Sequence, residues 1–248
     1  MLLETELVPY GLSVPPGERV LVLAPHPDDE TFGMGGSLRL LTESGKKVKV
    51  VILTTGEKAD PKVADKQEYL STRKKEALKA FRHLGVTDYE FLEFPDRELI
   101  SHRDKVEEII NTIVSDFSPD VIYSPSLIEL NPDHRMAAEL SIELSRREKA
   151  VRCVFYEITT PVRPNILIDI TKTFKWKKKA MKCYKSQLKL TDYLDLMQAI
   201  SRYRTFTLGK GVKFAEAFWE LRNTSARQDI RMWLSYEMPL VVNSTQRR

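Results

Sequence analysis

The sequence has little of what builds disulfide scaffolds or membrane spans. Its 248 residues contain only two cysteines, Cys153 and Cys183, which excludes a disulfide framework. No segment approaches the roughly 18 consecutive apolar residues that a membrane span needs. The first twenty residues also lack the basic and apolar regions of a signal peptide. We therefore expect a cytoplasmic protein that has no transmembrane segment and meets any lipid-linked substrate from the surface.

Two common enzyme motifs are also missing. No G-x-S-x-G sequence occurs, so the chain lacks the serine elbow of the α/β-hydrolases. Gly33 and Gly35 follow an apolar segment as in a dinucleotide-binding fold, but the third glycine of that fingerprint would fall at Leu38. The net charge of +4 favours anionic partners weakly, and we expect no nucleic acid partner.

Apolar segments of strand length alternate with amphipathic segments of helix length. Strands are predicted at 19–24, 47–55, 89–94, 120–124, 151–159 and 165–171, with helices between them. Ser101 and Asp104 have capping-box spacing before a helix whose apolar residues form one stripe. This alternation predicts an α/β, Rossmann-like fold with a mostly parallel sheet, helices on both faces and an active site at the carboxyl ends of the strands. We expect one domain over 1–248, with a core at about 18–190 and a helical or irregular region at about 191–248.

Two acidic, histidine-containing segments follow predicted strands. "HPDDE" (26–30) follows the first strand, and "NPDHR" (131–135) follows the strand at 120–124. The fold would bring both to one crevice, where His26, Asp29 and His134 form a ligand set typical of catalytic zinc. Asp28 is then a spare carboxylate that could accept a proton from a water activated by the metal. The alternative is that the acidic residues only favour the positive N-terminus of the following helix.

Six segments in order resemble the LmbE-like, or PIG-L, family of zinc-dependent N-acetylsugar deacetylases. They are "APHPDDETFGMGG", "TTGE", "RKKEALKAFRHLG", "FPDREL", "NPDHR" and "KKAMKCYKSQ". The resemblance implies hydrolysis of the acetamide of an amino sugar, usually N-acetylglucosamine in a small-molecule conjugate. It also implies zinc at His26, Asp29 and His134, although another divalent metal is compatible, and Asp28 as the base. Arg73 and Asp96 would hold sugar hydroxyls; the alternative is a surface helix arginine and a turn aspartate.

One position departs from the family pattern. The second motif usually reads H-x-D-H, and its first histidine is thought to be held by the aspartate, here Asp133, and to stabilise the oxyanion. Asn131 occupies that position. Its amide can donate hydrogen bonds to the oxyanion and contact Asp133, but it cannot titrate as imidazole does. Two alternatives therefore stay open: a metal- or sugar-binding protein with little or no catalysis, and a zinc amidohydrolase acting on a lipid- or nucleotide-linked acetamido sugar.

The segment from about 172 to 190 is rich in lysine. We expect one helix there, with its lysines mostly on one side and Phe174, Met181, Tyr184 and Leu188 facing inward. The lysines form either a solvated face or a surface for a phosphorylated carrier or nucleotide-linked sugar. A homo-oligomer is also compatible with the sequence.

Overall fold

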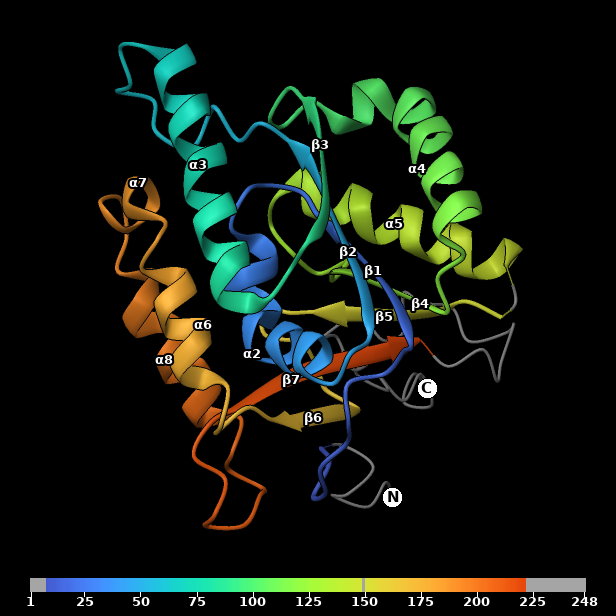
Figure 1. The fold of residues 1–248 in the computed structure, drawn as a ribbon, viewed down its shortest axis with the longest axis vertical. Coiled ribbons are helices and arrows are strands. Elements are labelled where there is room, and N and C mark those ends of the chain that lie inside the picture. The colour runs from blue at the N-terminus through green and yellow to red at the C-terminus, as the bar shows by residue number, and fades with distance from the viewer. Residues whose placement is uncertain (1–7, 149, 222–248) are drawn as a thin grey trace, which may run out of the picture.

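The computed structural model describes residues 8–148 and 150–221, which form a mostly parallel seven-stranded sheet covered by helices on both faces (Figure 1). The strand order is β3-β2-β1-β4-β5-β7-β6. The first five strands run parallel, and β7 is antiparallel to both β5 and β6. The strands are β1 (Arg19–Ala24), β2 (Lys47–Thr54), β3 (Asp88–Phe94), β4 (Val121–Pro125), β5 (Arg152–Tyr156), β6 (Ile166–Asp169) and β7 (Ala215–Leu221). The predicted fold class is confirmed.

The helices lie on two sides of this sheet. α2 (Asp29–Glu43), α3 (Lys66–Leu84), α6 (Phe174–Met181) and α8 (Tyr193–Tyr203) share one core with one face, and α7 (Lys185–Leu188) lies beside them. α4 (Arg103–Phe117), α5 (Pro132–Arg147) and the short 3-10 helix η1 (Leu99–His102) pack on the other face. Figure 1 shows α3, α6 and α8 to the left of the sheet and α4 to its right.

The alternation of side chains along β1 explains these two cores. Val20 and Val22 point into the core shared with α2, α3 and α6, whereas Leu21 and Leu23 point into the core shared with α4 and α5. All four side chains are fully buried. A strand buried on both faces has a continuous apolar sequence, which is why "VLVLA" was recognisable as a central parallel strand.

Two predicted details are wrong. α4 begins at Arg103, and its N-cap is His102 rather than Ser101, which belongs to η1. The lysine-rich segment is two helices, α6 and α7, not one. Of the residues predicted to face inward, Phe174, Met181 and Tyr184 are buried and Leu188 is half-buried. Lys177 is also buried and pairs with Glu216 of β7.

The C-terminal region contributes to the sheet beyond the predicted core of 18–190. β7 adds residues 215–221, and α8 adds a helix with Met197 in the core. The remainder of the predicted C-terminal region, 222–248, lies outside the described residues, and the single-domain prediction stays a prediction. None of the described helices combines the length and hydropathy needed to cross a membrane.

α2 approaches the sheet closely and changes direction at Met34, where the backbone leaves the helical conformation. A Cβ atom at Gly33 would lie 2.3 Å from the ring of Tyr156, so only glycine fits there. The helix restarts with Glu216 accepting hydrogen bonds from the backbone N–H groups of Gly36 (2.9 Å) and Ser37 (2.7 Å). Gly33 thus serves helix–sheet packing, whereas a Cβ atom at Gly35 would lie 3.2 Å from the side chain of Lys177 in α6.

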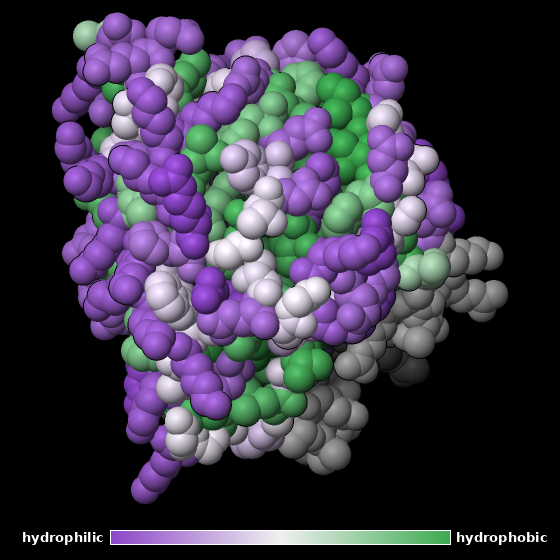
Figure 2. Space-filling view, viewed as in Figure 1, coloured by the Kyte–Doolittle hydropathy of each residue, from purple (hydrophilic) through white to green (hydrophobic). Residues whose placement is uncertain are grey.

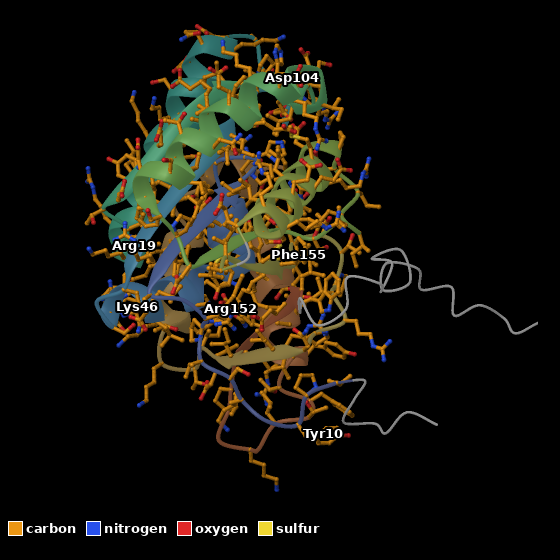
Figure 3. The ribbon with its side chains drawn as sticks, turned by 90° about the vertical axis from the view of Figure 1, so that its right-hand side faces the viewer. Tyr10, Arg19, Lys46, Asp104, Arg152 and Phe155 are labelled. Carbon is orange, nitrogen blue, oxygen red and sulfur yellow. The ribbon has the colours of Figure 1, made fainter. Side chains whose placement is uncertain are left out.

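The two ends of the sheet differ in charge: basic residues lie near the amino ends of the parallel strands, and the acidic motifs lie at their carboxyl ends. Arg19, Lys46 and Arg152, at or next to the starts of β1, β2 and β5, lie well below Asp104, which is at the top of Figure 3. The carboxyl ends of the parallel strands face the opposite way and hold both acidic motifs. Figure 2 shows hydrophilic residues gathered over α3 and α6, consistent with a solvated face for most of the lysines.

Candidate metal centre and active site

Both motifs lie at the carboxyl ends of neighbouring parallel strands. β1 pairs with β4, so the residues after Ala24 and those after Pro125 meet at one edge of the sheet. His26 lies in the turn after β1, and Asp29 is the first residue of α2. Asn131 is the N-cap of α5, with Asp133 and His134 in its first turn. The two motifs therefore meet at the carboxyl ends of β1 and β4, as predicted.

Three ligand atoms form a tight triangle. His26 Nδ1 lies 3.0 Å from Asp29 Oδ2 and 3.2 Å from His134 Nε2, and His134 Nε2 lies 3.2 Å from the same Asp29 oxygen. All three residues are buried. Asp29 Oδ2 also accepts the backbone N–H of His26 at 2.8 Å, which fixes the turn between them. Two imidazoles and a carboxylate thus direct one atom each toward a common point.

Outer carboxylates orient both histidine rings. His26 Nε2 lies 3.0 Å from Asp96 Oδ1 and 3.4 Å from Asp133 Oδ2. His134 Nδ1 lies 3.6 Å from Glu129 Oε2. Carboxylates behind histidine ligands fix the ring tautomer and increase ligand basicity. Asp96, predicted at sugar hydroxyls, thus contacts His26 with one oxygen and accepts the backbone N–H of Lys58 (3.0 Å) with the other.

The cluster shifts the pKa values of its members in opposite directions. Burial opposes the charged form of each, but the facing Asp29 carboxylate holds the pKa of His26 well above its usual value and raises that of His134 to about 9. His134 and His26 in turn hold the pKa of Asp29 well below its usual range despite its burial. Each group therefore depends on the others for compensation of its charge.

Asp28 faces a different partner. Its side chain makes no capping hydrogen bond to α2, although Asp28 is the N-cap residue and Asp29 and Glu30 lie in the first turn, where the helix N-terminus alternative places them. Instead Oδ2 accepts a hydrogen bond from Arg73 Nη2 at 2.9 Å, and Asp28 has the unusual φ of 146° for a non-glycine residue. Burial raises the pKa of Asp28 to about 7, against the opposing charge of Arg73. Backbone strain of this kind persists only where surrounding contacts enforce it.

Arg73 is a buried residue of α3, not a surface arginine. Nη2 also donates to the carbonyl of Pro27 (3.0 Å), and Nη1 donates to the carbonyl of Gly56. Gly56 has φ of 65°, and a Cβ atom there would lie 2.0 Å from Arg73 Nη1. This close approach explains the glycine of "TTGE". Arg73 thus holds Asp28, and its predicted contact with sugar hydroxyls stays a prediction.

Asn131 and Asp133 contact one another differently from the expectation. Asn131 Oδ1 accepts the backbone N–H of Asp133 at 2.9 Å and so caps α5. The carboxylate of Asp133 turns away and accepts the backbone N–H groups of Arg97 (2.6 Å) and Leu99 (3.2 Å). Oδ1 is engaged in this cap, and among residues 8–148 and 150–221 the two N–H donors of the Asn131 amide have no partner and can serve the pocket that Asn131 lines.

A cavity of about 290 Å³ opens over the cluster. It is lined by the predicted residues His26, Asp28, Asp29, Arg73, Asp96, Asn131 and His134, and also by residues that the sequence reasoning did not single out, among them Phe32, Arg97, Thr159, Leu190 and Tyr193. Arg97 stood in the quoted "FPDREL" segment. Tyr193 belongs to α8, a region with no readable signal.

Glu129 is a further residue that the sequence reasoning missed. It is buried, and its carboxylate accepts the backbone N–H groups of Ile158 (2.9 Å), Thr159 (3.2 Å) and Thr160 (3.2 Å). Burial raises its pKa, but His134 and Thr159 outweigh this effect and keep the pKa below its usual value. An acidic residue two positions before "NPDH" was the available signal. Glu129 thus links a predicted metal ligand to a wall of the cavity.

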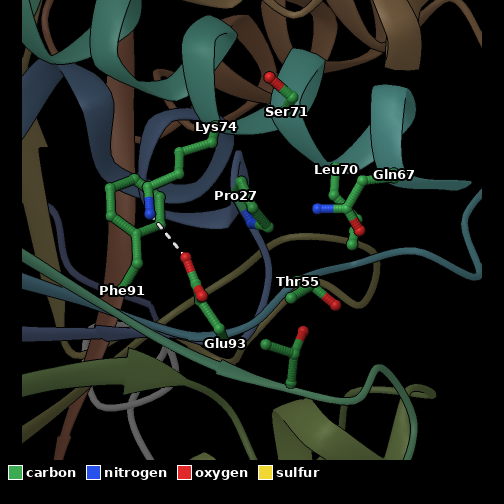
Figure 4. A pocket seen from close by; sticks show the side chains of 9 residues that line it. Pro27, Thr55, Gln67, Leu70, Ser71, Lys74, Phe91 and Glu93 are labelled. Atoms are coloured by element: carbon green, nitrogen blue, oxygen red, sulfur yellow. Dashed lines mark hydrogen bonds and ion pairs between the residues drawn. The ribbon is translucent and has the colours of Figure 1, made fainter.

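A second cavity of about 280 Å³ lies beside the first, between α3 and the ends of β2 and β3 (Figure 4). Pro27, the neighbour of His26 in sequence, lines it. Lys74 and Glu93 form an ion pair of 2.6 Å across it, and Lys74 lies 4.9 Å from the centre of the Phe91 ring. Its cation is therefore paired.

Comparison with known proteins fixes the family. The model of the PIG-L family, described as GlcNAc-PI de-N-acetylase, matches residues 21–145, which contain both motifs. The chain belongs to the PIG-L family. The resemblance found in the sequence is thereby confirmed.

Curated relatives of this PIG-L member are named as deacetylases. The diacetylchitobiose deacetylase of Thermococcus kodakarensis is 29% identical, over 80% of this chain and 81% of that protein. A probable N-acetyl-α-D-glucosaminyl L-malate deacetylase 2 of Bacillus cereus is 28% identical, over 68% of this chain and 83% of that one. The two relatives are thus named for N-acetylglucosamine conjugates with different second groups.

Solved structures show the same fold. The N,N'-diacetylchitobiose deacetylase of Pyrococcus horikoshii superposes with a TM-score of 0.73 at 25% identity, covering 88% of this chain and 89% of that one. The 4-carboxy-2-hydroxymuconate hydratase GalB of Pseudomonas putida has a TM-score of 0.69 at 22% identity, covering 85% and 98%. Because a hydratase shares the fold, the fold alone does not identify the reaction.

Proposed function

We propose that this protein is a zinc-dependent N-deacetylase that hydrolyses the acetamide of an N-acetylglucosamine-type conjugate. The observation that carries the proposal is the convergence of His26, Asp29 and His134 on one point, with the Asp28 carboxylate beside it. Relatives of the chain are named as deacetylases of this substrate class. Two imidazoles and a carboxylate are a donor set that suits catalytic zinc.

The three ligand atoms fit a single zinc ion. Tetrahedral zinc with ligand bonds of about 2.0–2.1 Å separates neighbouring ligand atoms by roughly 3.3 Å. The observed separations are 3.0 to 3.2 Å. A second group, His26, Asp96 and Asp133, also lies close together, but it offers only one imidazole. We assign that group to orienting His26, because carboxylates behind a histidine ligand serve this purpose.

The metal, when bound, would polarise the acetamide carbonyl and make water a better nucleophile. Asp28 would accept a proton from the attacking water, and Arg73 would hold its carboxylate in place. The free N–H donors of Asn131 would stabilise the negative charge that develops on the carbonyl oxygen. Asp28 would then deliver the proton to the leaving nitrogen, so that the C–N bond breaks and acetic acid and an amine form; the acid then passes its proton to the amine, which leaves acetate and an ammonium group.

The contacts of Asn131 favour one alternative. Its amide already caps α5 through Oδ1, and an amide cannot deliver a proton. A metal- or sugar-binding protein with weak catalysis would keep the metal ligands and lose turnover. A third candidate is the same hydrolysis on a lipid- or nucleotide-linked acetamido sugar, which differs only in substrate.

The test is acetate release from a panel of acetamido-sugar conjugates by zinc-loaded protein, with metal content measured in parallel. The proposal expects acetate from at least one conjugate, loss of activity with a chelator, and recovery when zinc is restored. Stoichiometric zinc without acetate from any neutral, acidic, lipid-linked or nucleotide-linked conjugate would contradict the enzyme assignment and leave the binding protein.

A further inference from the structure

Arg97 places a free guanidinium at the cavity that contains the metal-ligand cluster. Its side chain is exposed and lines the cavity. Within residues 8–148 and 150–221, it has no ion pair and no side-chain hydrogen bond. We propose that Arg97 selects a substrate whose second group, beyond the N-acetylglucosamine, carries a carboxylate or phosphate. This inference rests on the proposed function of the same site.

The backbone of Arg97 is fixed relative to the cluster. The residue has φ of 62°, in the left-handed region that non-glycine residues rarely adopt. Its N–H donates to Asp133 Oδ2 at 2.6 Å, and the same oxygen lies 3.4 Å from His26 Nε2. The strained conformation is therefore held by a carboxylate that also contacts a predicted ligand. The Arg97 side chain therefore starts from a backbone position that is fixed relative to the cluster.

The remaining charges of the cavity are already engaged. Arg73 is buried against Asp28, Pro27 and Gly56. Asp29 faces the two histidines, and Asp96 contacts His26. Nearby, Lys58 pairs with Glu98 at 2.7 Å. Among the described residues that line the cavity, Arg97 is thus the cation that can pair with an anionic ligand.

A guanidinium matches carboxylate and phosphate groups with two parallel hydrogen bonds, which gives both energy and orientation. Arg97 and the cluster line one cavity, so a substrate with its acetamide at the cluster can present its other end to Arg97. The relatives include deacetylases named for a malate conjugate, which is acidic, and for diacetylchitobiose, which is neutral. Family membership therefore does not decide whether the second group of the substrate is charged, and the inference rests on the position of Arg97 in the cavity.

The experiment compares three probes: the methyl glycoside of N-acetylglucosamine, its glycoside with malate, and N-acetylglucosamine 1-phosphate. Binding of their deacetylated forms, which cannot be hydrolysed, is measured by calorimetry on zinc-loaded protein, and acetate release is measured on the probes themselves. Arg97→Met removes the charge without changing the backbone strain. Arg97→Lys keeps the charge but lacks the planar guanidinium that makes two parallel hydrogen bonds. Arg146→Met is the matched control, because Arg146 is exposed near the far end of α5, about 20 Å from the site.

We expect at least one acidic form to bind about 10- to 100-fold more tightly than the neutral form. Arg97→Met should abolish this preference, Arg97→Lys should reduce it, and Arg146→Met should leave it unchanged. The malate and phosphate arms identify which anion is preferred. Equal binding of all three forms, or a preference that survives Arg97→Met, overturns the inference. Acetate release decides the proposed function separately, because binding selectivity is read without turnover.

Discussion

Arg73 Nη2 lies 2.9 Å from Asp28 Oδ2, and both side chains are buried although they stand 45 positions apart in the chain. The pair links α3 to the N-cap of α2. Arg73 also ties down the carbonyls of Pro27 and Gly56, so that one guanidinium organises the turn that presents Asp28 to the cavity.

Breaking this pair from either side should be costly. Arg73→Met should lower the free energy of unfolding by about 3–5 kcal/mol, since it leaves a buried carboxylate without its partner. The double variant Arg73→Met with Asp28→Asn should recover part of the loss, because the unpaired charge is then gone. Denaturant unfolding of all four proteins without metal gives the coupling energy. Strictly additive losses would show that the two side chains do not stabilise one another.

Gly56→Ala should destabilise the protein more than Gly45→Ala. Both glycines have positive φ, 65° and 76°, so alanine costs about 1–2 kcal/mol at each. Only at Gly56 would the new Cβ meet Arg73, at 2.0 Å; at Gly45 it would have open space. The difference in unfolding midpoints measures the contact with Arg73. Equal effects would mean that Arg73 moves aside freely.

His26→Ala and His134→Ala should each remove most of the bound zinc, because each deletes one of three ligands. Asp28→Asn should keep the zinc and lose turnover, since this residue is proposed as the base and not as a ligand. His83→Ala serves as the control, because His83 lies on α3 outside the cavity lining. Elemental analysis and acetate release are the measurements. Full zinc occupancy in either ligand variant would refute this assignment.

Asn131→Asp separates the two roles of this residue. Aspartate keeps the oxygen that caps α5, so thermal stability should change little. It loses the N–H donors and places negative charge in the cavity, so turnover should fall by about 100-fold or more. Asn131→Ala should lose both the cap, worth about 1 kcal/mol, and turnover. Asn131→His restores the family pattern and should raise activity. Unchanged turnover in Asn131→Ala would remove the oxyanion role.

Glu129→Gln should weaken zinc binding by about 10- to 100-fold, because the charge facing the outer nitrogen of His134 is lost. The near-isosteric change keeps one acceptor for the loop at residues 158–160. Competition with a coloured chelator measures the affinity. Glu108→Gln, on the exposed side of α4, makes the same charge change away from the site and should have no effect. Equal affinities in the two variants would make Glu129 a support of the loop only.

The central strands and the positions of the two motifs could be predicted because both depend on patterns within short segments of the sequence. Central strands such as β1 were evident as apolar segments, and the position of His26 and His134 after neighbouring strands predicted their convergence. β7 was missed for a physical reason. Its Glu216 is buried, and the Lys177 that compensates it is 39 positions away, so the segment does not have the composition of a buried strand.

The contacts among site residues were harder to predict than their identities. The types and spacing of His26, Asp28 and Asp29 indicated metal chemistry, but nothing local indicated that Arg73 would hold Asp28 or that Asp96 would contact His26. Both contacts join residues far apart in sequence and depend on how α3 and the end of β3 pack. Likewise, the cap formed by Asn131 follows from its backbone position at the start of α5.

Because β7 lies between β5 and β6, the last three strands of the sheet can pair only in a fixed order while the chain is being synthesised. Residues 152–156 leave the ribosome about 60 positions before their neighbour at 215–221, so the edge of β5 stays unpaired while the intervening helices are made. β6 cannot join the sheet until that neighbour arrives, because it is bonded to β7 and not to β5. A nascent chain that stalls before Ala215 therefore exposes a parallel-sheet edge and carries Lys177 without its counter-charge, which makes it a target for chaperones.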